Sequence, residues 1–141
     1  AALAAFATLM ERMGGDGRVL IQRQIRGKVE LILGLLRDPQ FGPCVMFGLG
    51  GVTAEIFDDA VFAVAPLTRR DALALITRIR GQKMLDGFRG VPPVDRDAVA
   101  RILVALGEIG LRYGRIREID INPLIAGEQG AVAVDATIIL E

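Results

Sequence analysis

The chain has 141 residues, of which 52% are hydrophobic, and its 17 basic residues balance 17 acidic ones. This length and composition fit one folded domain with a substantial core, and the charge balance favours neither nucleic acid nor an anionic membrane as the partner. The sequence has one cysteine and no histidine, which excludes an internal disulfide, Ser-His or Cys-His catalysis and metal binding through histidine by this chain alone.

The N-terminal segment, AALAAFATLMERM, predicts a helix because its apolar residues recur at helical spacing before a glycine pair. It lacks a basic leader and contains Glu11 and Arg12, so we interpret it as a helix rather than a signal peptide. No apolar run approaches the ~20 residues that a membrane span requires. Together with the scarcity of cysteine, these features favour a reducing, cytoplasmic location.

Three strands are expected next in the chain. Residues 19–25, VLIQRQI, alternate apolar with polar residues, and residues 29–36 are apolar except for Glu30 and Gly34. The short apolar run at residues 44–47 predicts a buried strand, in which the single cysteine is a core residue rather than a nucleophile.

A glycine loop at the end of this third strand is the first candidate site. Gly50 and Gly51 permit a sharp turn, and successive backbone N–H groups in such a loop can bind an anion. A carboxylate, Glu55, follows shortly after. Because GLGG matches neither a Walker A sequence nor the dinucleotide fingerprint, the sequence supports a tight turn at least as well as a phosphate site. The corresponding alternative for Glu55 is a solvated carboxylate.

The middle of the chain predicts a strand at residues 60–65 and then two helices. Thr68, with Asp71 three residues later, predicts the N-cap of the first helix. Asp95 predicts the N-cap of the second, which runs through Leu111. The intervening segment is rich in glycine and proline and has no clear periodicity, and loops of this length are usually functional or mobile.

The C-terminal segment predicts short strands at residues 116–121, 124–126 and 131–134. Strands and helices are therefore mixed along the chain without strict βαβ alternation. The expected fold is α+β, in a single domain that spans residues 1–141.

An acidic segment near the C-terminus is the second candidate site. Asp120 and Asn122 are two residues apart, so on a strand they face the same side. The sequence GEQG is typical of a hairpin turn, and if its two glycines face each other, Asn122 faces Asp135 with Cβ atoms ~5 Å apart. A hard cation could then bridge the two side chains, with phosphates and water as its other ligands. Spacing alone favours the alternative, in which Asn122 and Pro123 form a turn and Asp135 ends a strand at the surface.

Several segments together resemble nucleoside-diphosphate-forming acyl-CoA synthetases, including acetyl-CoA synthetase β-type chains. VELILGLLRDPQFGPCVMFGLGGVTAE, then GFRG with VPPVD, then EIDINPL with VAVDA occur in the order seen in the C-terminal portion of the ATP-grasp domain of that family. The related succinyl-CoA synthetase β chains share the glycine pair followed by a carboxylate and the acidic-x-Asn-Pro-Leu segment. The resemblance runs from about Val19 to Leu140 and implies an ATP-grasp C-terminal lobe, a mostly antiparallel sheet packed with helices.

The resemblance implies an ADP-forming acid–thiol ligase, which joins a carboxylic acid to CoA through an acyl phosphate and a phosphohistidine. Asn122 and Asp135 would be the Mg²⁺ ligands, which makes the metal pair the favoured interpretation of this segment. Asp120 would be the acidic residue beside the phosphoryl-transfer centre. ATP or ADP would be the bound nucleotide, and CoA would be bound mainly elsewhere.

The resemblance also assigns the other candidate residues. Gly50, Gly51 and Glu55 would belong to the loop near the phosphates. VLIQRQI matches the hinge strand that lies along adenine in ATP-grasp folds, which would place four residues near the base: Gln22, Arg23, Gln24 and Ile25. This assignment suits phosphoryl transfer, which mainly requires positioning and neutralisation of charge.

The resemblance further implies partners for the chain. The ATP-grasp domain of this family has an N-terminal lobe with a lysine for the phosphates, and residues 1–18 resemble only the final helix of that lobe. The phosphohistidine would lie on a CoA-binding domain or another subunit, since this chain has no histidine. We therefore expect the chain alone to be inactive, and an oligomer is compatible with the resemblance.

Two alternatives remain at this point. In the first, the chain is a non-ligating, regulatory domain like those fused to acetyltransferase domains in bacterial protein lysine acetyltransferases. In the second, it is an interaction or assembly module, which would be favoured if Asn122 and Asp135 pointed away from each other.

Overall fold

The computed structural model describes the chain apart from residues 1, 26, 28, 52–58, 88 and 129. The elements in chain order are α1 (Ala2–Arg12), β1 (Val29–Asp38), β2 (Gly42–Leu49), β3 (Ala60–Val64), α3 (Arg69–Ile76), the 3₁₀ helix η1 (Gln82–Asp86), α4 (Arg96–Arg112), β4 (Ile116–Gly127), β5 (Gly130–Ala133) and β6 (Ala136–Leu140). In the described part of the chain, no helix has the length and apolar character needed to cross a membrane.

The strands form a six-stranded sheet in the order β3-β2-β1-β4-β5, and every pair is antiparallel. β6 also pairs with β4, so the 12-residue β4 pairs with β6 along its first half and with β5 along its second half. This arrangement confirms the expected α+β class with a mostly antiparallel sheet.

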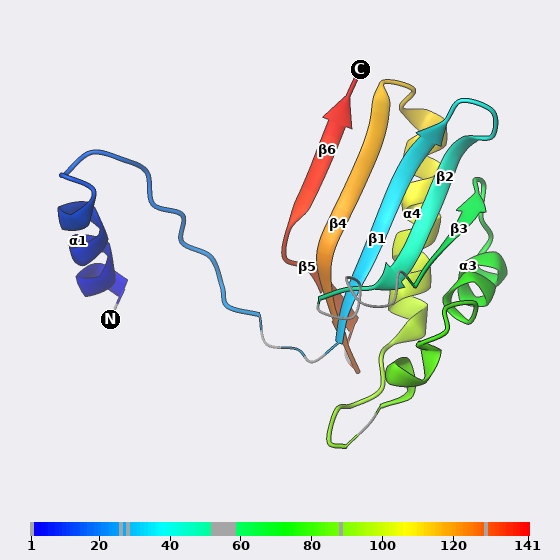
Figure 1. Cartoon of the computed structure of the whole chain (residues 1–141), viewed down its shortest axis with the longest axis horizontal. Helices are drawn as coiled ribbons and strands as arrows, with labels where there is room; N and C mark the ends of the chain where they lie inside the picture. The colour runs from blue at the N-terminus through cyan, green and yellow to red at the C-terminus, as the bar shows by residue number, and fades with distance from the viewer. Residues whose placement is uncertain (1, 26, 28, 52–58, 88, 129) are drawn as a thin grey trace.

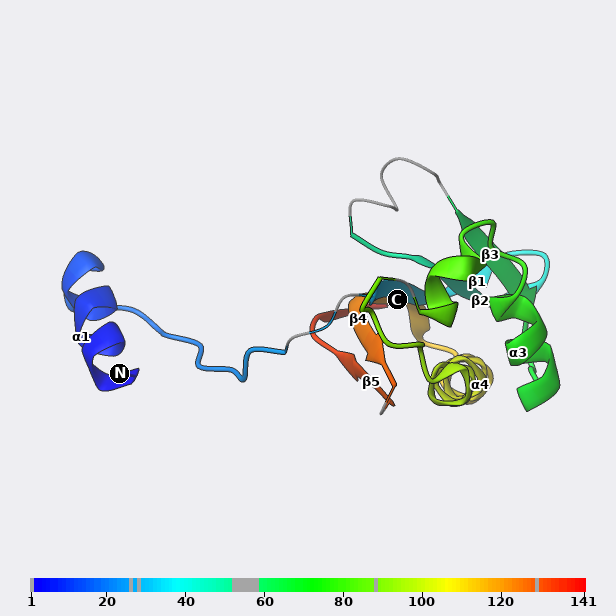
Figure 2. The same ribbon diagram turned by 90° about the horizontal axis from the view of Figure 1, so that it is seen from below.

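Helices α3 and α4 cover one face of this sheet, and no described helix covers the other (Figures 1 and 2). The alternation of β1 explains the two faces, because Leu31, Leu33 and Leu35 are at most 1% exposed and pack in the core with Leu103 of α4. Burying each such side chain stabilises the fold by about 1.5–3 kcal/mol. We call the uncovered side of the sheet the open face.

Both predicted helix starts are confirmed. The backbone N–H of Asp71 donates to Thr68 Oγ1 at 3.2 Å, and the N–H of Thr68 donates to the Asp71 carboxylate at 2.9 Å, which completes a capping box. The Asp95 carboxylate accepts a hydrogen bond from the Ala98 N–H at 2.9 Å at the start of α4. These caps fix the ends of the helices that support the sheet.

The predicted N-terminal helix is confirmed as α1, but the predicted strand at residues 19–25 is wrong. α1 has no buried residue and lies apart from the sheet, at the end of an irregular segment that includes residues 19–25 (Figure 1). A strand is stabilised by hydrogen bonds to a neighbouring strand, and no described strand pairs with this segment. Alternation in the sequence therefore did not suffice to form one.

The C-terminal strands also differ from the prediction. Residues 116–121 and 124–126 are parts of one strand, β4, and residues 136–140 form an additional strand that was not expected. Pro123 lies inside β4, where the register with β1 shifts between Leu31 and Leu33. Proline cannot donate to the ladder, and an irregularity of this kind is where a sheet tolerates it.

Candidate functional site

The candidate residues lie on the open face, beside successive outward-facing residues of β1. Glu30, Ile32, Gly34 and Leu36 occupy alternate positions of β1 and face away from the core. Going along the strand, Glu30 lies beside the glycine loop, Ile32 lies at the register shift opposite β4, and Gly34 pairs with Asp120. The glycine loop, the Asn122 region and Asp120 are therefore successive positions on one surface.

Asn122 and Asp135 face each other across the sheet, as the predicted turn requires. Gly127 pairs with Gly130, and the pairing continues on both sides of the break between β5 and β6. The N–H of Asn122 donates to the Asp135 carbonyl oxygen at 3.2 Å. Of the alternative, the turn at Asn122 and Pro123 is wrong, because both residues lie within β4, whereas Asp135 does lie at the surface beside the end of a strand.

Asp135 lies in the break between β5 and β6, outside the ladder of either strand. Its side chain is exposed, and one carboxylate oxygen accepts a hydrogen bond from the N–H of Ala136 at 2.8 Å. Asn122 is also exposed. Both side chains are thus open to solvent and accessible to a ligand on the sheet.

Asp120 lies two residues before Asn122 on β4, between Gly34 of β1 and Thr137 of β6. Burial raises the pKa of the Asp120 carboxyl above its usual value, and the negative charges of Glu118 and Asp135 raise this pKa further. This part of the open face thus concentrates acidic groups that would be stabilised by a cation.

The side-chain oxygens at this position suit a cation whose remaining ligands are phosphates and water. Among the described residues, no three histidine, cysteine or acidic side chains are grouped so that they could hold a metal ion. The oxygens of Asn122 and Asp135 are the hard ligands that Mg²⁺ prefers, and Mg²⁺ usually takes one or two protein carboxylates together with phosphates and water.

The glycine loop packs tightly against the start of β1. The N–H of Gly50 donates to the Glu30 carbonyl oxygen at 2.7 Å, and Gly51 has a φ of 62°. A Cβ atom added to Gly51 would lie 2.5 Å from Glu30 Oε2. The left-handed backbone conformation therefore favours glycine at position 51, whereas the Glu30 carboxylate lies at the end of an exposed, flexible side chain that can move aside.

Glu30 is a site residue that the sequence interpretation did not single out, although a signal for it was present. Glu30 and Gly34 are the two interruptions in an otherwise apolar strand, and both face the open side. An acidic residue in such a pattern indicates a solvent-facing or functional position. Glu55, the acidic residue that was singled out, lies outside the described residues.

The four residues predicted to lie near the base precede β1. Gln22, Arg23 and Gln24 are exposed, and Ile25 is half-buried. Arg23, Gln24 and Ile25 line a groove of about 1080 Å³ between this segment, α4 and the β4–β5 hairpin. They therefore lie near the end of β1 that carries the glycine loop, whereas Asp120 lies further along the strand.

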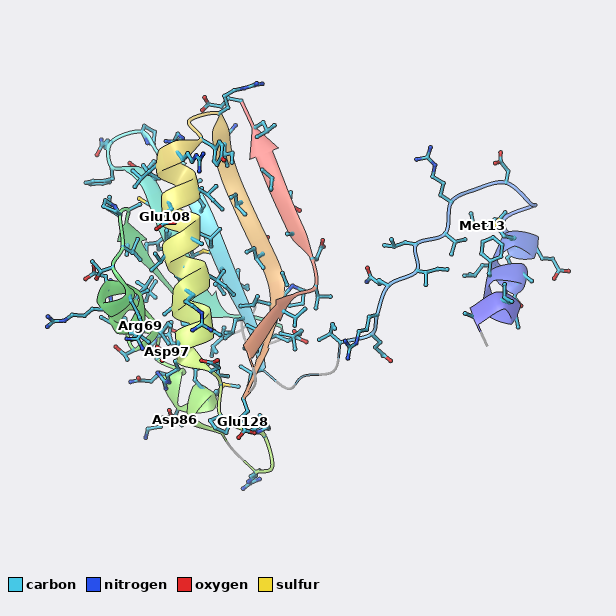
Figure 3. The ribbon with its side chains drawn as sticks, turned by 180° about the vertical axis from the view of Figure 1, so that it is seen from behind. Met13, Arg69, Asp86, Asp97, Glu108 and Glu128 are labelled. Carbon is cyan, nitrogen blue, oxygen red and sulfur yellow. The ribbon has the colours of Figure 1, made fainter. Side chains whose placement is uncertain are left out.

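The helix-covered side carries ion pairs rather than a comparable cluster of acidic residues. Arg69 pairs with Asp97 at 2.5 Å, and Arg96 pairs with Asp86 at 2.6 Å (Figure 3). Glu108 lies on α4 on this same side (Figure 3). Because the pairs are largely exposed, each contributes about 0–1 kcal/mol to stability, and neither forms part of the candidate site.

Comparison with known proteins identifies related sequences. The model of a family described as ATP-grasp domain matches residues 1–140. The β subunit of acetate–CoA ligase [ADP-forming] I from Pyrococcus furiosus is 51% identical over 122 residues, which cover 86% of this chain and 53% of that subunit. The chain thus spans about half the length of this relative.

Solved structures agree with the sequence matches. The apo form of a dinucleotide forming acetyl-coenzyme A synthetase 1 from Ca. Korarchaeum cryptofilum is 44% identical, has a TM-score of 0.85, and is matched over 99% of this chain and 66% of that chain. A second structure of that enzyme, with coenzyme A and Mg-AMPPCP and a phosphohistidine segment pointing towards the nucleotide binding site, is 52% identical with a TM-score of 0.79, over 84% of this chain and 55% of that chain. These names are those of ligases and synthetases, which gives the regulatory alternative no support.

Proposed function

This chain belongs to the ATP-grasp domain family, and we propose that it is the Mg·ATP-holding portion of an ADP-forming acyl-CoA synthetase. The complete enzyme would join a carboxylic acid to CoA and convert ATP to ADP and phosphate, through an acyl phosphate and a phosphohistidine. It would work in the cytoplasm. The observation that carries the proposal is the pairing of Asn122 with Asp135 beside Asp120 on the open face.

The residues of this chain would have different roles in phosphoryl transfer, according to their positions on the open face. Asn122 and Asp135 would hold Mg²⁺, which when bound neutralises phosphate charge. The Asp120 carboxylate would stabilise the positive charge that a histidine side chain develops as it is phosphorylated. In that step the imidazole nitrogen forms a bond to the γ-phosphorus, the bond from the γ-phosphorus to ADP breaks, and ADP leaves with the electron pair.

The glycine loop and the segment before β1 would bind the remainder of the nucleotide. We propose that the backbone at Gly50 and Gly51 lies near the phosphates, together with Glu55. The groove beside Arg23, Gln24 and Ile25 supports placing the base at this end of the sheet, with Gln22 nearby. The nucleotide would then run along β1 from the glycine loop towards Asp120.

The rest of the site would come from other parts of the protein. We propose that residues 1–18 are the last helix of a preceding ATP-grasp lobe, and that the exposed apolar side of α1 packs against that lobe. The phosphohistidine would be carried by a CoA-binding domain or subunit, because this chain has no histidine. We therefore expect the 141-residue chain alone to form no acyl-CoA.

The Asp135→Ala substitution in the complete synthetase tests the proposal. It removes one of two side chains that would hold the cation, so we expect acyl-CoA formation to fall at least ~100-fold. Mg²⁺-dependent nucleotide binding, measured by calorimetry, should weaken in parallel. The fold should be retained because Asp135 is exposed and lies outside the strand ladders.

Glu108→Ala is the matched control for this experiment. Glu108 is an exposed acidic residue on α4, on the opposite side of the sheet (Figure 3). We expect it to leave turnover and nucleotide binding at the parental level. Unchanged turnover in the Asp135 variant would exclude the metal assignment.

A further inference from the structure

Asp59, directly before β3, is the only buried residue with a charged side chain in the part of the chain that the structure describes. Its two side-chain oxygens accept backbone hydrogen bonds from the segment after α3: Oδ1 from the N–H of Arg80 at 2.8 Å, and Oδ2 from the N–H of Gly81 at 2.7 Å. The Arg80 side chain lies 3.8 Å from Oδ1 but is 77% exposed, so this ion pair adds little. The two backbone bonds therefore hold the carboxylate in place and offset the cost of burying it.

Asp59 and Gly81 lie against the residue from which the glycine loop leaves β2. A Cβ atom added to Gly81 would lie 2.4 Å from Leu49 Cδ1 and 3.3 Å from Asp59 Oδ2, so the Gly81 backbone fills the space between these two side chains. Leu49 is 4% exposed, and Gly50 follows it directly in the chain. The Asp59 carboxylate thus fixes the backbone segment against which the end of β2 packs.

The start of the glycine loop depends on contacts with its neighbours. Gly50 has no side chain to pack, and glycine has greater backbone freedom than any other residue. On one side, the N–H of Gly50 donates to the Glu30 carbonyl oxygen of β1 at 2.7 Å. On the helix-covered side, Leu49 packs against Gly81, which donates to Asp59. The loop therefore begins between β1 and the contact of Gly81 with Asp59.

Resting on the proposed function, we propose that Asp59 is a positioning residue for Mg·ATP, which acts on the glycine loop through Gly81 and Leu49. A loop whose backbone must first become ordered loses binding free energy to that ordering. By fixing the end of β2, Asp59 would hold the backbone at Gly50 and Gly51 ready for the phosphates. Asp59 would not itself touch the nucleotide, because its side chain is buried and both its oxygens accept from the segment after α3.

The Asp59→Asn substitution in the complete synthetase tests this inference. Asparagine keeps the shape of the side chain but presents an NH₂ group in place of one acceptor oxygen, so one of the two backbone N–H groups loses its partner. We expect the dissociation constant of Mg·AMPPCP, measured by calorimetry, to rise at least ~10-fold. The KM for Mg·ATP should rise with it. The KM for CoA at saturating Mg·ATP should stay at the parental value, because CoA would be bound mainly outside this chain.

Asp71→Asn is the matched control for a lost backbone hydrogen bond. The Asp71 carboxylate accepts from the N–H of Thr68 at 2.9 Å, at the start of α3. This helix begins beyond the end of β3 that pairs with Cys44, and Leu49 is at the opposite end of β2. The control should lower the melting temperature and leave the affinity for Mg·AMPPCP at the parental value. A purely structural role for Asp59 would give the same result in both variants.

Gly81→Ala tests the same contact if the Asp59 variant does not fold. At Gly81 φ is −80°, which is open to alanine, so the N–H can still donate to Asp59. The added methyl group meets the buried Leu49 side chain and should displace the end of β2, which raises the dissociation constant of Mg·AMPPCP at least ~3-fold. Gly114→Ala, where a Cβ atom meets nothing within 4 Å, should leave this constant unchanged.

The possible failures of these experiments are distinguishable. If the proposed function is wrong, the unsubstituted synthetase forms no acyl-CoA from Mg·ATP. If only the inference about Asp59 is wrong, the unsubstituted enzyme is active and the Asp59 variant binds Mg·AMPPCP with parental affinity. An equal loss of affinity in the Asp59 and Asp71 variants would also overturn the inference, because general destabilisation would explain it. Should Asp59→Asn not fold, parental affinity in Gly81→Ala overturns the inference.

Discussion

At the scale of single residues, the raised pKa of Asp120 sets the stability of the free chain against the role that we propose for this carboxylate. Its raised pKa reflects burial and the nearby charges of Glu118 and Asp135, so its ionised form is unfavourable in the folded chain without a cation. In the role that we propose, a bound cation would stabilise this ionised form. Replacing Asp120 should therefore stabilise the free protein and damage the enzyme.

We predict that Asp120→Asn raises the free energy of unfolding at pH 7. Because the folded state binds this proton more tightly than the unfolded state, the stability of the parental chain falls as pH rises from the ordinary carboxyl pKa, about 3.9, through the raised pKa of Asp120. The gain should be present above that window and absent at about pH 3. Urea unfolding at pH 7 and at about pH 3 measures this gain in the free energy of unfolding. An equal gain at both pH values would contradict a raised pKa of Asp120.

Gly51 carries a second prediction at this scale. Gly51→Ala should cost about 1–2 kcal/mol of stability from the left-handed backbone, and little from the approach of Glu30, whose exposed side chain can turn away. The added Glu30→Ala substitution should therefore recover little of this cost, which a double-mutant cycle measures. Gly114→Ala is the control, since a Cβ there meets nothing within 4 Å and φ is not positive. A cost at Gly51 no greater than at Gly114 would contradict the left-handed backbone at position 51.

At the scale of elements, Arg37 joins the end of β1 to the turn between α4 and β4. Its Nε donates to the Ile116 carbonyl at 3.1 Å, and one guanidinium nitrogen donates to the carbonyls of Gly110 and Tyr113 at 2.7 Å and 3.2 Å. The bonds to Gly110 and Tyr113 satisfy carbonyl groups at the C-terminal end of α4 that lack partners within the helix. They also hold the end of α4 against the helix-covered side of the sheet.

We predict that Arg37→Lys lowers the free energy of unfolding by about 1–3 kcal/mol, because an ammonium group lacks the fixed fork that reaches several carbonyls. Urea denaturation of the chain measures the loss. Arg117→Lys, at an exposed position of β4, should change stability by less than about 0.5 kcal/mol. Similar effects at the two positions would show that the contacts of Arg37 contribute nothing specific.

Some elements could be predicted from the sequence and others could not. The helix caps at Thr68 and Asp95 and the turn at Gly127 were predictable because each is determined by a few adjacent residues. The seven residues VLIQRQI have the alternation of a strand, but no described strand pairs with them. β6 is a strand because it pairs with β4, and its own short sequence did not predict it. Local sequence patterns therefore failed for the strands whose formation depends on pairing with a distant segment.

The candidate site follows the same division. The facing positions of Asn122 and Asp135 could be predicted because one short hairpin fixes the register between them. The position of Glu30 beneath the glycine loop could not, because it depends on how the end of β2 folds over β1. The roles of these residues in binding remain predictions for the experiments above.

At the scale of the whole molecule, the sheet with α3 and α4 contains the core, and α1 contributes nothing to it. We predict that removing residues 1–18 changes the free energy of unfolding by less than about 0.5 kcal/mol, because α1 has no buried residue. Urea unfolding of the full and shortened chains measures the difference. A loss greater than about 1 kcal/mol would show that α1 packs on the sheet in solution.

The break between β5 and β6 has a consequence for how such a chain can diverge. Asp135 lies where two strands end, so its side chain is required neither by the core nor by a ladder. If Asp135 holds the cation as we propose, a single inherited change there would remove the chemistry while every buried residue stays in place. We therefore expect descendants that keep the fold but have exchanged Asp135 to be as stable as the parent and to form no acyl-CoA.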